Sequence, residues 1–374
     1  MLRAAFRLYW KIYSLQGGWH REYAKYMRKH ALNKKQCRRQ ITLLQKIYLE
    51  KYPEKNRNSF TLKLKTLDFL ICRYLFGTHA DSEYYYLLYE NYGWKLRNRF
   101  VTVDRANFAC HYLNDQHVGE ICLNKVKAAE YWSDWFKRKW YLKEPEKELT
   151  AEDLKTIFGP EGKCIVKPLK DYGGHGIFVL DPKKKDFSEK LESLNEAAES
   201  HILETYLNQT GVLHTLNESS LNTVRLITAR HPDGEIETLG SIMRTGRAGA
   251  VVDNVSSGGV SFDVDINTGR VYFGTDYHGY VYTSHPDTGL PIEGMQIPRW
   301  REIQEFAYAA HKYAPEGLNF AAWDICLTEE DIYLIEVNHR PAVCARNPDR
   351  LAPWERLKIL FDEYESVRSG KQRS

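Results

Sequence analysis

The range of folds open to this chain is limited most by a change in its sequence pattern near residue 160. Beyond that point, short β-type apolar runs alternate with turn sequences such as "HPDGE" and "NTGR". The nine runs are "CIVKPL", "GIFVLD", "HILETYL", "NTVRLITAR", "EIETLGSIMR", "GGVSFDVD", "RVYFGT", "FAAWDICLT" and "DIYLIEVN". Two helical segments, "DFSEKLESLNEAAES" and "PRWREIQEFAYAAHKYA", interrupt the series. This arrangement predicts antiparallel sheets backed by helices.

The first 80 or so residues follow a different pattern. Segments such as "HREYAKYMRKHALNKKQCRRQITLLQKIYLEKY" and "TLKLKTLDFLICRYLF" have apolar residues at helical spacing and contain little glycine or proline. They predict a helical N-terminal region, without the alternating strands and helices of a βα fold in the first 120 or so residues. We therefore expect the α+β class, with a helical front followed by sheets.

The composition excludes several classes of protein. With 43% hydrophobic and 27% charged residues, the chain resembles an ordinary globular protein. No apolar run approaches the roughly 20 residues that span a bilayer, and the start of the chain lacks the pattern of a signal peptide. The seven cysteines are scattered without CxxC spacing, so we expect reduced thiols in a cytoplasmic protein and neither disulfides nor a zinc site.

Charge is distributed unevenly along the chain. Residues 1–60 contain fifteen Lys and Arg and three Glu, a net charge of +12, whereas the whole chain carries +4 and the remainder therefore −8. A basic end on an acidic body indicates an anionic partner for that end, such as a membrane surface, a lipid-linked phosphate or nucleic acid. Nucleic acid is not expected, because no base-reading module is visible.

The sequence of the first helix bears on which anionic partner the basic end binds. Arg3, Arg7 and Lys11 repeat every four residues and form one basic stripe. The other positions hold apolar and aromatic residues, among them Leu2, Phe6, Tyr9, Trp10 and Tyr13. This pattern is typical of a helix that lies among lipid headgroups, which would make the protein peripheral at the inner face of the membrane. It is also typical of a helix packed on its own domain with a solvated charged stripe.

The sharpest chemical signal lies in "AAWDICLTEEDIYLIEVNHRPA". Two strands joined by a tight turn place Asp324 on the first strand, while Glu336 and Asn338 share a face of the second because they are two positions apart. Two carboxylates and an amide oxygen suit Mg²⁺, which takes hard oxygen ligands. The alternative is an exposed hairpin whose acidic residues lie on the surface. The apolar stretch "YLIEV" around Glu336 argues against this alternative, because a charged carboxylate in apolar surroundings needs a partner.

A hairpin of this kind, downstream of a lysine-bearing strand and the glycine-rich "DYGGHGI", resembles the ATP-grasp superfamily over roughly residues 125–340. "LNESSLNTVRLIT" resembles in particular the sugar-transfer-associated subgroup, which accompanies polysaccharide-building genes. The resemblance implies an ATP-grasp fold, in which two α+β subdomains clasp ATP. It implies four parts: a basic helical N-terminal region (1–82), an N-terminal or linker part of the grasp unit (83–158), a small subdomain with the phosphate loop (159–208) and a large subdomain with the metal site and C-terminal tail (209–374).

The same resemblance implies which residues hold ATP. Lys167 of "CIVKP" and Lys125 of "LNKVK" match lysines that contact phosphates. The glycine-rich stretch matches a flexible phosphate loop, in which glycines let backbone N–H groups face phosphate oxygens, although alone it is also consistent with a hairpin that has a loose turn. "HILETYL" matches the strand that lines adenine. The expected ATP-binding residues are Lys125, Lys167, Gly173, Gly174, His175, Gly176, Glu204 and Tyr206.

Three arginines are candidates for catalysis by resemblance. Arg225 and Arg244 match strand positions that face the transferred phosphate in related ligases. Arg340, which follows the metal-binding asparagine, is expected either to bind the substrate carboxylate or to form a surface salt bridge. Asp253 and Arg247 are further candidates in the stretch after Arg244.

The loop "NVSSGG" resembles the substrate loop of ribosomal-protein and amino-acid-carrier glutamate ligases. In that resemblance, its backbone N–H groups hold the acid substrate. The expected substrate-binding residues are Asn254, Ser256, Ser257, Gly258 and Gly259.

The function that the resemblance implies is an ATP- and Mg²⁺-dependent ligase. It would activate the carboxylate of a sugar acid or small molecule as an acyl phosphate and join it to an amine or amino acid, in cell-surface polysaccharide or related biosynthesis. No protein nucleophile is required, and no G-x-S-x-G elbow is present. Two alternatives stay open: a phosphotransferase of the same fold that acts on a hydroxyl group, and a non-catalytic nucleotide-binding scaffold.

Overall fold

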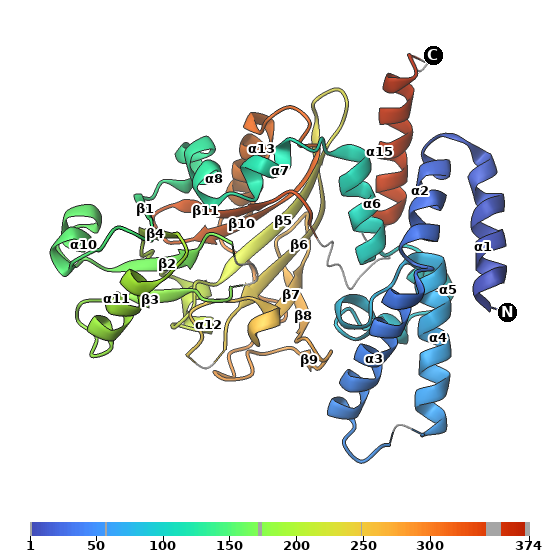
Figure 1. Cartoon of the computed structure of the whole chain (residues 1–374), viewed down its shortest axis with the longest axis horizontal. Coiled ribbons are helices and arrows are strands. Elements are labelled where there is room, and N and C mark those ends of the chain that lie inside the picture. Colours follow the sequence, from blue (N-terminus) through green and yellow to red (C-terminus); the bar gives the residue numbers. More distant parts are fainter. Residues whose placement is uncertain (1, 57, 171–173, 248, 342–352, 371–374) are drawn as a thin grey trace.

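The chain forms a small sheet, a large sheet and a helical N-terminal part, which follow one another along the long axis of the molecule (Figure 1). The computed structural model describes residues 2–56, 58–170, 174–247, 249–341 and 353–370. The predicted α+β class with a helical N-terminal region is confirmed.

Helices make up the ordered elements before residue 140. They are α1 (Leu2–Tyr13), η1 (Ser14–Gln16), α2 (Gly18–Lys29), α3 (Lys34–Lys51), α4 (Phe60–Phe76), η2 (Ala80–Tyr85), η3 (Tyr89–Asn91), α5 (Trp94–Arg97), α6 (Val103–Leu113), α7 (Val118–Cys122), α8 (Lys125–Tyr131) and α9 (Ser133–Phe136). The side chains of Asn33 and Ser59 cap α3 and α4 by accepting backbone hydrogen bonds, and Gly77, with φ of 73°, ends α4. As predicted, no strand precedes residue 140 in the described part of the chain.

The strands form two antiparallel sheets. The four-stranded sheet has the order β1-β4-β2-β3, and the seven-stranded sheet has the order β11-β10-β5-β6-β7-β8-β9. The strands are β1 (Trp140–Lys143), β2 (Cys164–Pro168), β3 (Phe178–Leu180), β4 (His201–Thr205), β5 (Thr223–Arg230), β6 (Ile236–Thr245), β7 (Val260–Val264), β8 (Val271–Thr275), β9 (Val281–Tyr282), β10 (Phe320–Leu327) and β11 (Ile332–Asn338). The later helices are α10 (Ala151–Phe158), α11 (Phe187–Glu196), α12 (Val212–Leu216), η4 (Val255–Ser257), α13 (Trp300–Tyr313) and α15 (Pro353–Arg368).

All nine predicted strand segments are strands, and the two predicted helices between them form as α11 and α13. The sequence patterns did not predict several further elements, among them β1, β9, α10, α12 and α15. β1 has four residues and β9 only two, so neither has a run long enough to reveal its period. Because β1 pairs with β4, the small sheet begins before residue 159, and the four-part division of the chain stays a prediction.

The seven-stranded sheet is buried on both faces, which explains why its strands are almost continuously apolar. Trp323 and Ile325 of β10 belong to the core shared with α8, α9 and α13. Phe320 and Ala322 of the same strand belong to the core shared with α2, α6 and α15. The large sheet is therefore the central layer of the molecule.

The aromatic side of α1 packs against the protein. Trp10 is 2% exposed and donates its indole N–H to the Tyr74 carbonyl at 2.9 Å, and the ring of Phe6 lies 5.5 Å from that of Tyr74. Arg3 donates to the Leu32 carbonyl at 2.7 Å. The side of α1 that carries Phe6 and Trp10 is therefore part of the core, in agreement with the second interpretation of this helix.

The helix that follows is held by the last one. Trp19 of α2 donates its indole N–H to Asp362 at 2.7 Å and its backbone N–H to Glu365 at 3.0 Å, and both acceptors lie on α15. The ring of Trp19 also lies 5.1 Å from that of Phe361. Residues separated by more than 340 positions thus form one helical layer over the large sheet.

The tyrosine-rich segment "EYYYLLYENY" joins the helical part to the edge of the large sheet. The backbone carbonyl of Tyr86 accepts a 2.6 Å hydrogen bond from the hydroxyl of Thr275 in β8. The phenol hydroxyl of Tyr86 is hydrogen-bonded to the hydroxyl of Ser261 in β7. Gly279, with φ of 74°, passes so close that an added Cβ would lie 2.3 Å from the Tyr85 carbonyl oxygen. This segment therefore anchors the region before residue 100 on the side of β7 and β8.

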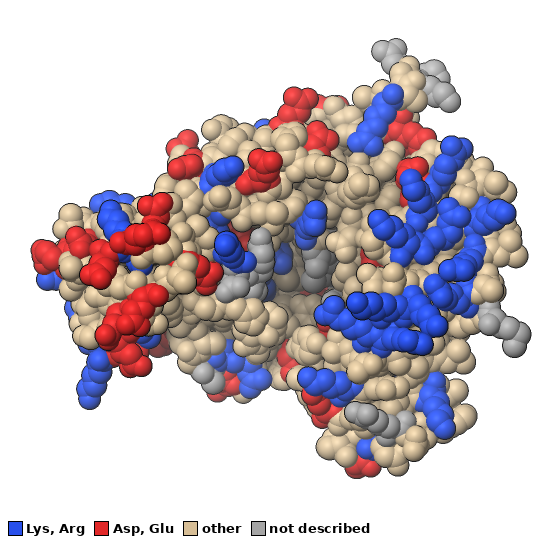
Figure 2. All heavy atoms as spheres, in the orientation of Figure 1, with Lys and Arg blue, Asp and Glu red and all other residues tan. Residues whose placement is uncertain are grey.

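The two ends of the molecule differ in surface charge. Figure 2 shows Lys and Arg side chains gathered over the N-terminal helices, whereas acidic groups are frequent over the small sheet with α10 and α11. Among the described residues, no helix combines the length and the apolar character that crossing a bilayer requires.

We predict that Trp10→Ala destabilises the whole protein by about 3–5 kcal/mol, because it empties a fully buried aromatic site. The change is measured by chemical denaturation followed by far-UV circular dichroism, because this signal reports secondary structure and does not rely on the fluorescence of Trp10. Leu8→Ala, on the exposed side of the same helix, is the matched control and should change stability by no more than about 0.5 kcal/mol. Equal effects of the two variants would mean that α1 is not part of the core.

Candidate functional site

A cavity of about 570 Å³ is lined by residues from both sheets. The small sheet contributes Lys167 and Glu204, and the large sheet contributes Arg244, Asp324 and Glu336. Concave sites of this size that combine apolar walls with a few convergent charged groups are the usual form of small-molecule sites.

Strand register sets the charged row on the large sheet. Glu336 of β11 lies opposite Asp324 of β10, and Asp324 lies opposite Arg225 of β5. Asn338 lies two residues beyond Glu336 on the same strand, opposite Ala322. A bulge in the β10–β11 pairing falls at Asp324, next to the cavity, a common place for bulges in functional sites.

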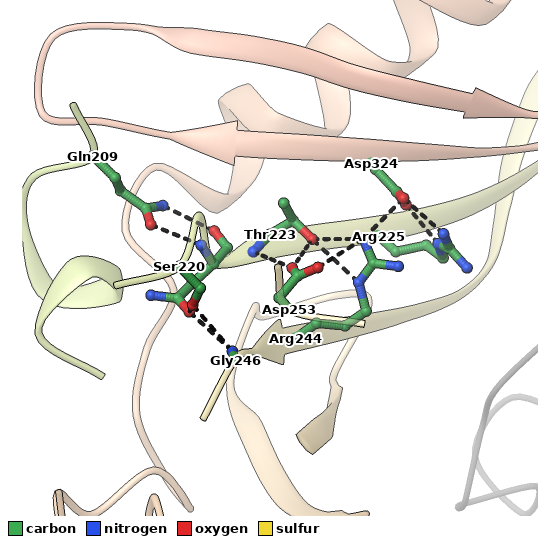
Figure 3. Close-up of polar contacts among 9 residues, drawn as sticks. Gln209, Ser220, Thr223, Arg225, Arg244, Gly246, Asp253 and Asp324 are labelled. Carbon is green, nitrogen blue, oxygen red and sulfur yellow. Dashed lines mark hydrogen bonds and ion pairs between the residues drawn. The ribbon is translucent and has the colours of Figure 1, made fainter. Parts of the chain in front are cut away.

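Asp324 is the most heavily bonded group in this row. It is 2% exposed and accepts two hydrogen bonds from Arg225, at 2.5 and 2.6 Å, and one from Arg244 at 2.8 Å (Figure 3). Burial alone would raise the pKa of Asp324, but the two guanidinium groups outweigh it and lower the pKa to about 2. Asp324 is therefore an anion that holds both predicted phosphate-facing arginines.

Arg244 is positioned from a second side. The Thr223 hydroxyl accepts from Arg244 Nη2 at 2.8 Å and donates to Asp253 at 2.5 Å (Figure 3). Asp253 also accepts the Thr223 backbone N–H at 3.0 Å and lies 3.5 Å from Arg244. The guanidinium of Arg244 is thus held between two carboxylates and a hydroxyl group.

The motif "LNESSLNTVR" orders the start of β5. Gln209 and Asn222 exchange hydrogen bonds, with Gln209 Nε2 donating to the Asn222 carbonyl at 2.8 Å and the Asn222 N–H donating to Gln209 Oε1 at 2.9 Å (Figure 3). Ser220 donates to Asn222 Oδ1 at 2.7 Å and accepts from the Gly246 N–H at 3.2 Å. Because these groups are buried and mutually satisfied, they hold Thr223 and Arg225 in place.

A second buried ion cluster lies on the small sheet. Lys167 donates to Glu204 at 2.8 Å, and Arg138 donates twice to the other oxygen of Glu204, at 2.7 and 3.1 Å. Burial favours a raised pKa for Glu204, but Lys167 and Arg138 lower it to about 2. The predicted phosphate lysine and the predicted adenine-side glutamate are therefore bonded to each other.

The remaining predicted ATP-binding residues have varied positions. Lys125 lines the cavity and donates to the Pro168 carbonyl at 2.8 Å, and Tyr206 lines it beneath Lys163, whose Nζ lies 3.6 Å from the ring centre. Gly174 also lines the cavity, whereas His175 and Gly176 are exposed and do not. The prediction for Gly173 falls outside the described residues.

Gly174 packs tightly against the other predicted loop. Its φ is +82°, and an added Cβ would lie 2.8 Å from the Asn254 side-chain oxygen. A side chain at this position would therefore strain the backbone and collide with the opposite wall. The glycine-rich stretch and the loop that begins at Asn254 meet at this point.

Of the predicted substrate-binding residues, only Asn254 lines the cavity. Ser256, Ser257 and Gly258 are exposed, and Gly259 is buried beneath them. The backbone N–H groups of Ser257 and Gly259 donate to the Asn254 carbonyl and that of Gly258 to the Val255 carbonyl, which closes the turn. These three N–H groups are thus used within the loop itself.

The two other predicted arginines, Arg340 and Arg247, lie in different surroundings from each other. Arg340 lines the cavity and is exposed. Arg247 lies elsewhere and pairs with Asp287 at 2.9 Å.

Whether the site fits Mg²⁺ depends on Glu336 and Asn338. In the described part of the chain, no side chain is hydrogen-bonded or ion-paired to the Glu336 carboxylate, and burial together with the facing Asp324 raises its pKa. The buried amide nitrogen of Asn338 also has no hydrogen-bond partner. The carboxylates of Glu336 and Asp324 offer the hard oxygens that a divalent cation prefers, whereas Asn338 would contribute its side-chain oxygen, because an amide nitrogen does not bind such a cation. Among the described residues, no group of three or more His, Cys, Asp or Glu side chains could hold a metal ion, so the predicted site would need Asn338 as its third ligand.

Sequence reasoning missed Arg138 and Thr223. Arg138 lies between α9 and β1, and β1 was not predicted. Thr223 precedes Arg225 by two positions, and strand periodicity places it on the face of Arg225. That periodicity is the sequence signal that could have identified Thr223. No comparable sequence signal points to Arg138.

A comparison with known families bears on the identity of the chain. The profile described as sugar-transfer associated ATP-grasp matches residues 142–347. No curated protein sequence matches the chain significantly.

Solved structures give weaker likenesses. The D-alanine–D-alanine ligase of Bacillus anthracis is 13% identical with a TM-score of 0.43, and the match covers 68% of this chain and 72% of that one. The N5-carboxyaminoimidazole synthetase of Staphylococcus aureus, complexed with ADP, is 12% identical with a TM-score of 0.42, and the match covers 74% of this chain and 60% of that one. Likenesses at this level do not carry a substrate from those enzymes to this chain.

We predict that Glu204→Gln destabilises the protein by about 3–5 kcal/mol at neutral pH, because Lys167 and Arg138 lose the charge that compensates them. The pKa of Glu204 is lowered from 4.5 to about 2, so its contribution to stability is present above pH 4.5 and is lost as pH falls towards 2. Denaturation measured across this pH range should therefore give a flatter stability curve for the variant. Glu152→Gln, on the exposed surface of α10, is the control and should keep the wild-type slope.

Proposed function

The chain belongs to the sugar-transfer associated ATP-grasp family, and from this premise we propose that it is an ATP-dependent ligase. It activates a carboxylate as an acyl phosphate and joins the acyl group to an amine, with release of ADP and phosphate. The observation that carries the proposal is the meeting, in one cavity, of Arg244 and Lys167 with the acidic pair Asp324 and Glu336. Opposed cationic and acidic groups of this kind suit phosphoryl transfer, in which catalysis is mainly positioning and electrostatic stabilisation.

In the first proposed step, a substrate carboxylate oxygen bonds to the γ-phosphorus of ATP and the bond to the bridging oxygen breaks, so that ADP leaves. Arg225 and Arg244 stabilise the charge that spreads over the phosphoryl oxygens, and Lys125 and Lys167 bind the phosphates. Mg²⁺ held by Asp324, Glu336 and Asn338 would supply further charge neutralisation on the phosphate oxygens.

Before phosphate binds, the arginines are held by the protein itself. Arg225 and Arg244 bond to Asp324, and Lys167 bonds to Glu204. When a phosphate replaces some of the carboxylate contacts of these cations, the cations need little reorganisation because they are already in position. Little reorganisation is the condition for strong electrostatic catalysis. The pairs also keep Arg244 and Lys167 in the cavity wall in the absence of nucleotide, whereas Arg225 does not line the cavity.

In the second proposed step, the amine nitrogen attacks the acyl carbon, the bond to the phosphate oxygen breaks, and the nitrogen loses a proton. No protein nucleophile takes part. Cys122 lines the cavity, but burial raises the pKa of its thiol to about 12, so it is protonated at neutral pH. This state of Cys122 favours direct transfer from acid to amine.

The substrates belong to the finer part of the proposal. The proposed acid is a carboxylate on a sugar or related precursor, and the proposed acceptor is an amine or amino acid, in the assembly of a cell-surface polysaccharide. The support for a sugar is the association of the family with sugar transfer. Arg340, which lines the cavity and is exposed, would bind the substrate carboxylate.

A phosphotransferase on the same fold is the second candidate. The sequence favoured ligation through the N–H groups of the loop that begins at Asn254, but those of Ser257, Gly258 and Gly259 are used within the turn. Phosphate transfer to a hydroxyl group needs the same cations and the same metal site, so it must be separated from ligation by experiment.

We predict that hydroxylamine, added with ATP and the correct acid, yields a hydroxamate at a rate that depends on ATP, because hydroxylamine attacks an acyl phosphate. ADP release screened over sugar acids and amino acids identifies the acid first. A stable phosphorylated product without hydroxamate would identify a phosphotransferase instead. ATP binding without any turnover across the screen would support the scaffold alternative.

We predict that Glu336→Gln lowers ATP turnover by at least about 100-fold and weakens the binding of Mn²⁺ measured by calorimetry, because the variant loses an anionic ligand. Glu330→Gln, on the exposed turn of the same hairpin, is the matched control and should leave both unchanged. Undiminished Mn²⁺ binding by Glu336→Gln would remove Glu336 from the metal site.

A further inference from the structure

A second apolar row on α1 faces away from the protein. The side chains of Leu8, Ile12 and Leu15 are 59%, 59% and 80% exposed. Leu8 and Ile12 are four positions apart on α1, and Leu15 continues the row in η1, so the three lie along one side of the helix. Trp10, on the opposite side, is 2% exposed. We call Leu8, Ile12 and Leu15 the apolar row.

Basic side chains border the apolar row. Arg7 and Lys11 are exposed and precede Leu8 and Ile12 by one position each, so they form the adjacent row of the helix surface. No Asp or Glu is present in α1. An exposed row of large aliphatic side chains beside a row of cations, without acidic residues, is the surface pattern of a helix that lies in a lipid interface.

The basic character extends over the neighbouring helices. Figure 2 shows Lys and Arg covering this end of the molecule. The exposed basic residues of α2 and α3 that form no ion pair within the described residues are Arg21, Arg28, Lys29, Lys34, Lys35, Arg38 and Arg39. Each cation close to an anionic membrane strengthens the attraction between the protein and the membrane.

We propose that the apolar row and the cations around it dock on an anionic lipid membrane, with Leu8, Ile12 and Leu15 inserted among the headgroups. The aliphatic row distinguishes this partner from nucleic acid, whose phosphates offer no apolar surface to bury. The positive charge distinguishes it from a second copy of the same face, because a two-fold contact would bring like charges together. Phe6 and Trp10 of α1 do not take part, since both are packed on the protein.

The proposal does not depend on the nucleotide chemistry, so it is tested separately, on the full chain. Co-sedimentation is measured with vesicles of phosphatidylcholine alone and with vesicles that also contain phosphatidylglycerol, at low and high salt. The protein should bind the anionic vesicles and release them at high salt. The triple variant Leu8→Ser, Ile12→Ser, Leu15→Ser should bind at least about tenfold more weakly, and the double variant Arg7→Glu, Lys11→Glu should do so as well.

The control variant replaces two other exposed aliphatic residues, Val212 on α12 and Ile359 on α15, which are 40% and 52% exposed. Val212→Ser, Ile359→Ser should bind vesicles like the wild type. Thermal melts establish that the variants are folded, which is expected because every replaced side chain is exposed; the double charge variant serves as the test if the triple variant is not folded.

Three results would overturn the proposal. Vesicle binding unchanged in the triple variant would show that the apolar row does not insert. Tight binding of RNA or DNA by a protein that ignores anionic vesicles would identify nucleic acid as the partner. Self-association that the triple variant abolishes, without vesicle binding by the wild type, would identify a second copy of the chain.

Discussion

The carboxylate of Asp324 is the group on which the arrangement of the large sheet depends. It lies 2% exposed between β5 and β11, and an isolated charge at such a depth would be strongly unfavourable. Its negative charge is stabilised because Arg225 on the adjacent strand meets both oxygens and Arg244, one strand further on, meets one of them. This bonding requires β10, β5 and β6 to keep a single register.

The same requirement explains the polar motif before β5. A shift of β5 by one residue would turn Thr223 and Arg225 to the other face of the sheet and leave Asp324 without its bidentate partner. Gln209, Ser220 and Asn222 hold the start of the strand through buried hydrogen bonds, so that such a shift would break several of them at once. On the small sheet, Glu204 has a comparable place between Lys167 and Arg138. Each wall of the cavity thus has one buried anion that orients two cations.

Sequence patterns predicted the strands and the closeness of Asp324 and Glu336, because alternation and hairpin turns are local. They did not predict that Lys167 bonds to Glu204 or that Arg244 bonds to Thr223, because these contacts depend on the pairing of strands that are distant in sequence. Arg138 was missed together with β1, whose four residues give no detectable period. For α1, the sequence offered apolar residues on two sides of the helix, and only the packing of Trp10 on Tyr74 distinguishes the inner side from the outer one.

The bonding of Trp19 to α15 has a consequence for the order in which the chain acquires its structure during synthesis. The indole N–H of Trp19 cannot form its hydrogen bond until Asp362 has been synthesised, 343 residues later. The hydroxyl of Tyr86 likewise lacks its partner until Ser261 has been synthesised. The amino-terminal helices therefore leave the ribosome with aromatic surfaces whose partners do not yet exist. At the roughly 5–20 residues per second of translation, these surfaces stay uncovered for tens of seconds. The nascent chain thus needs either a chaperone or a provisional packing of its first helices against one another until α15 is made.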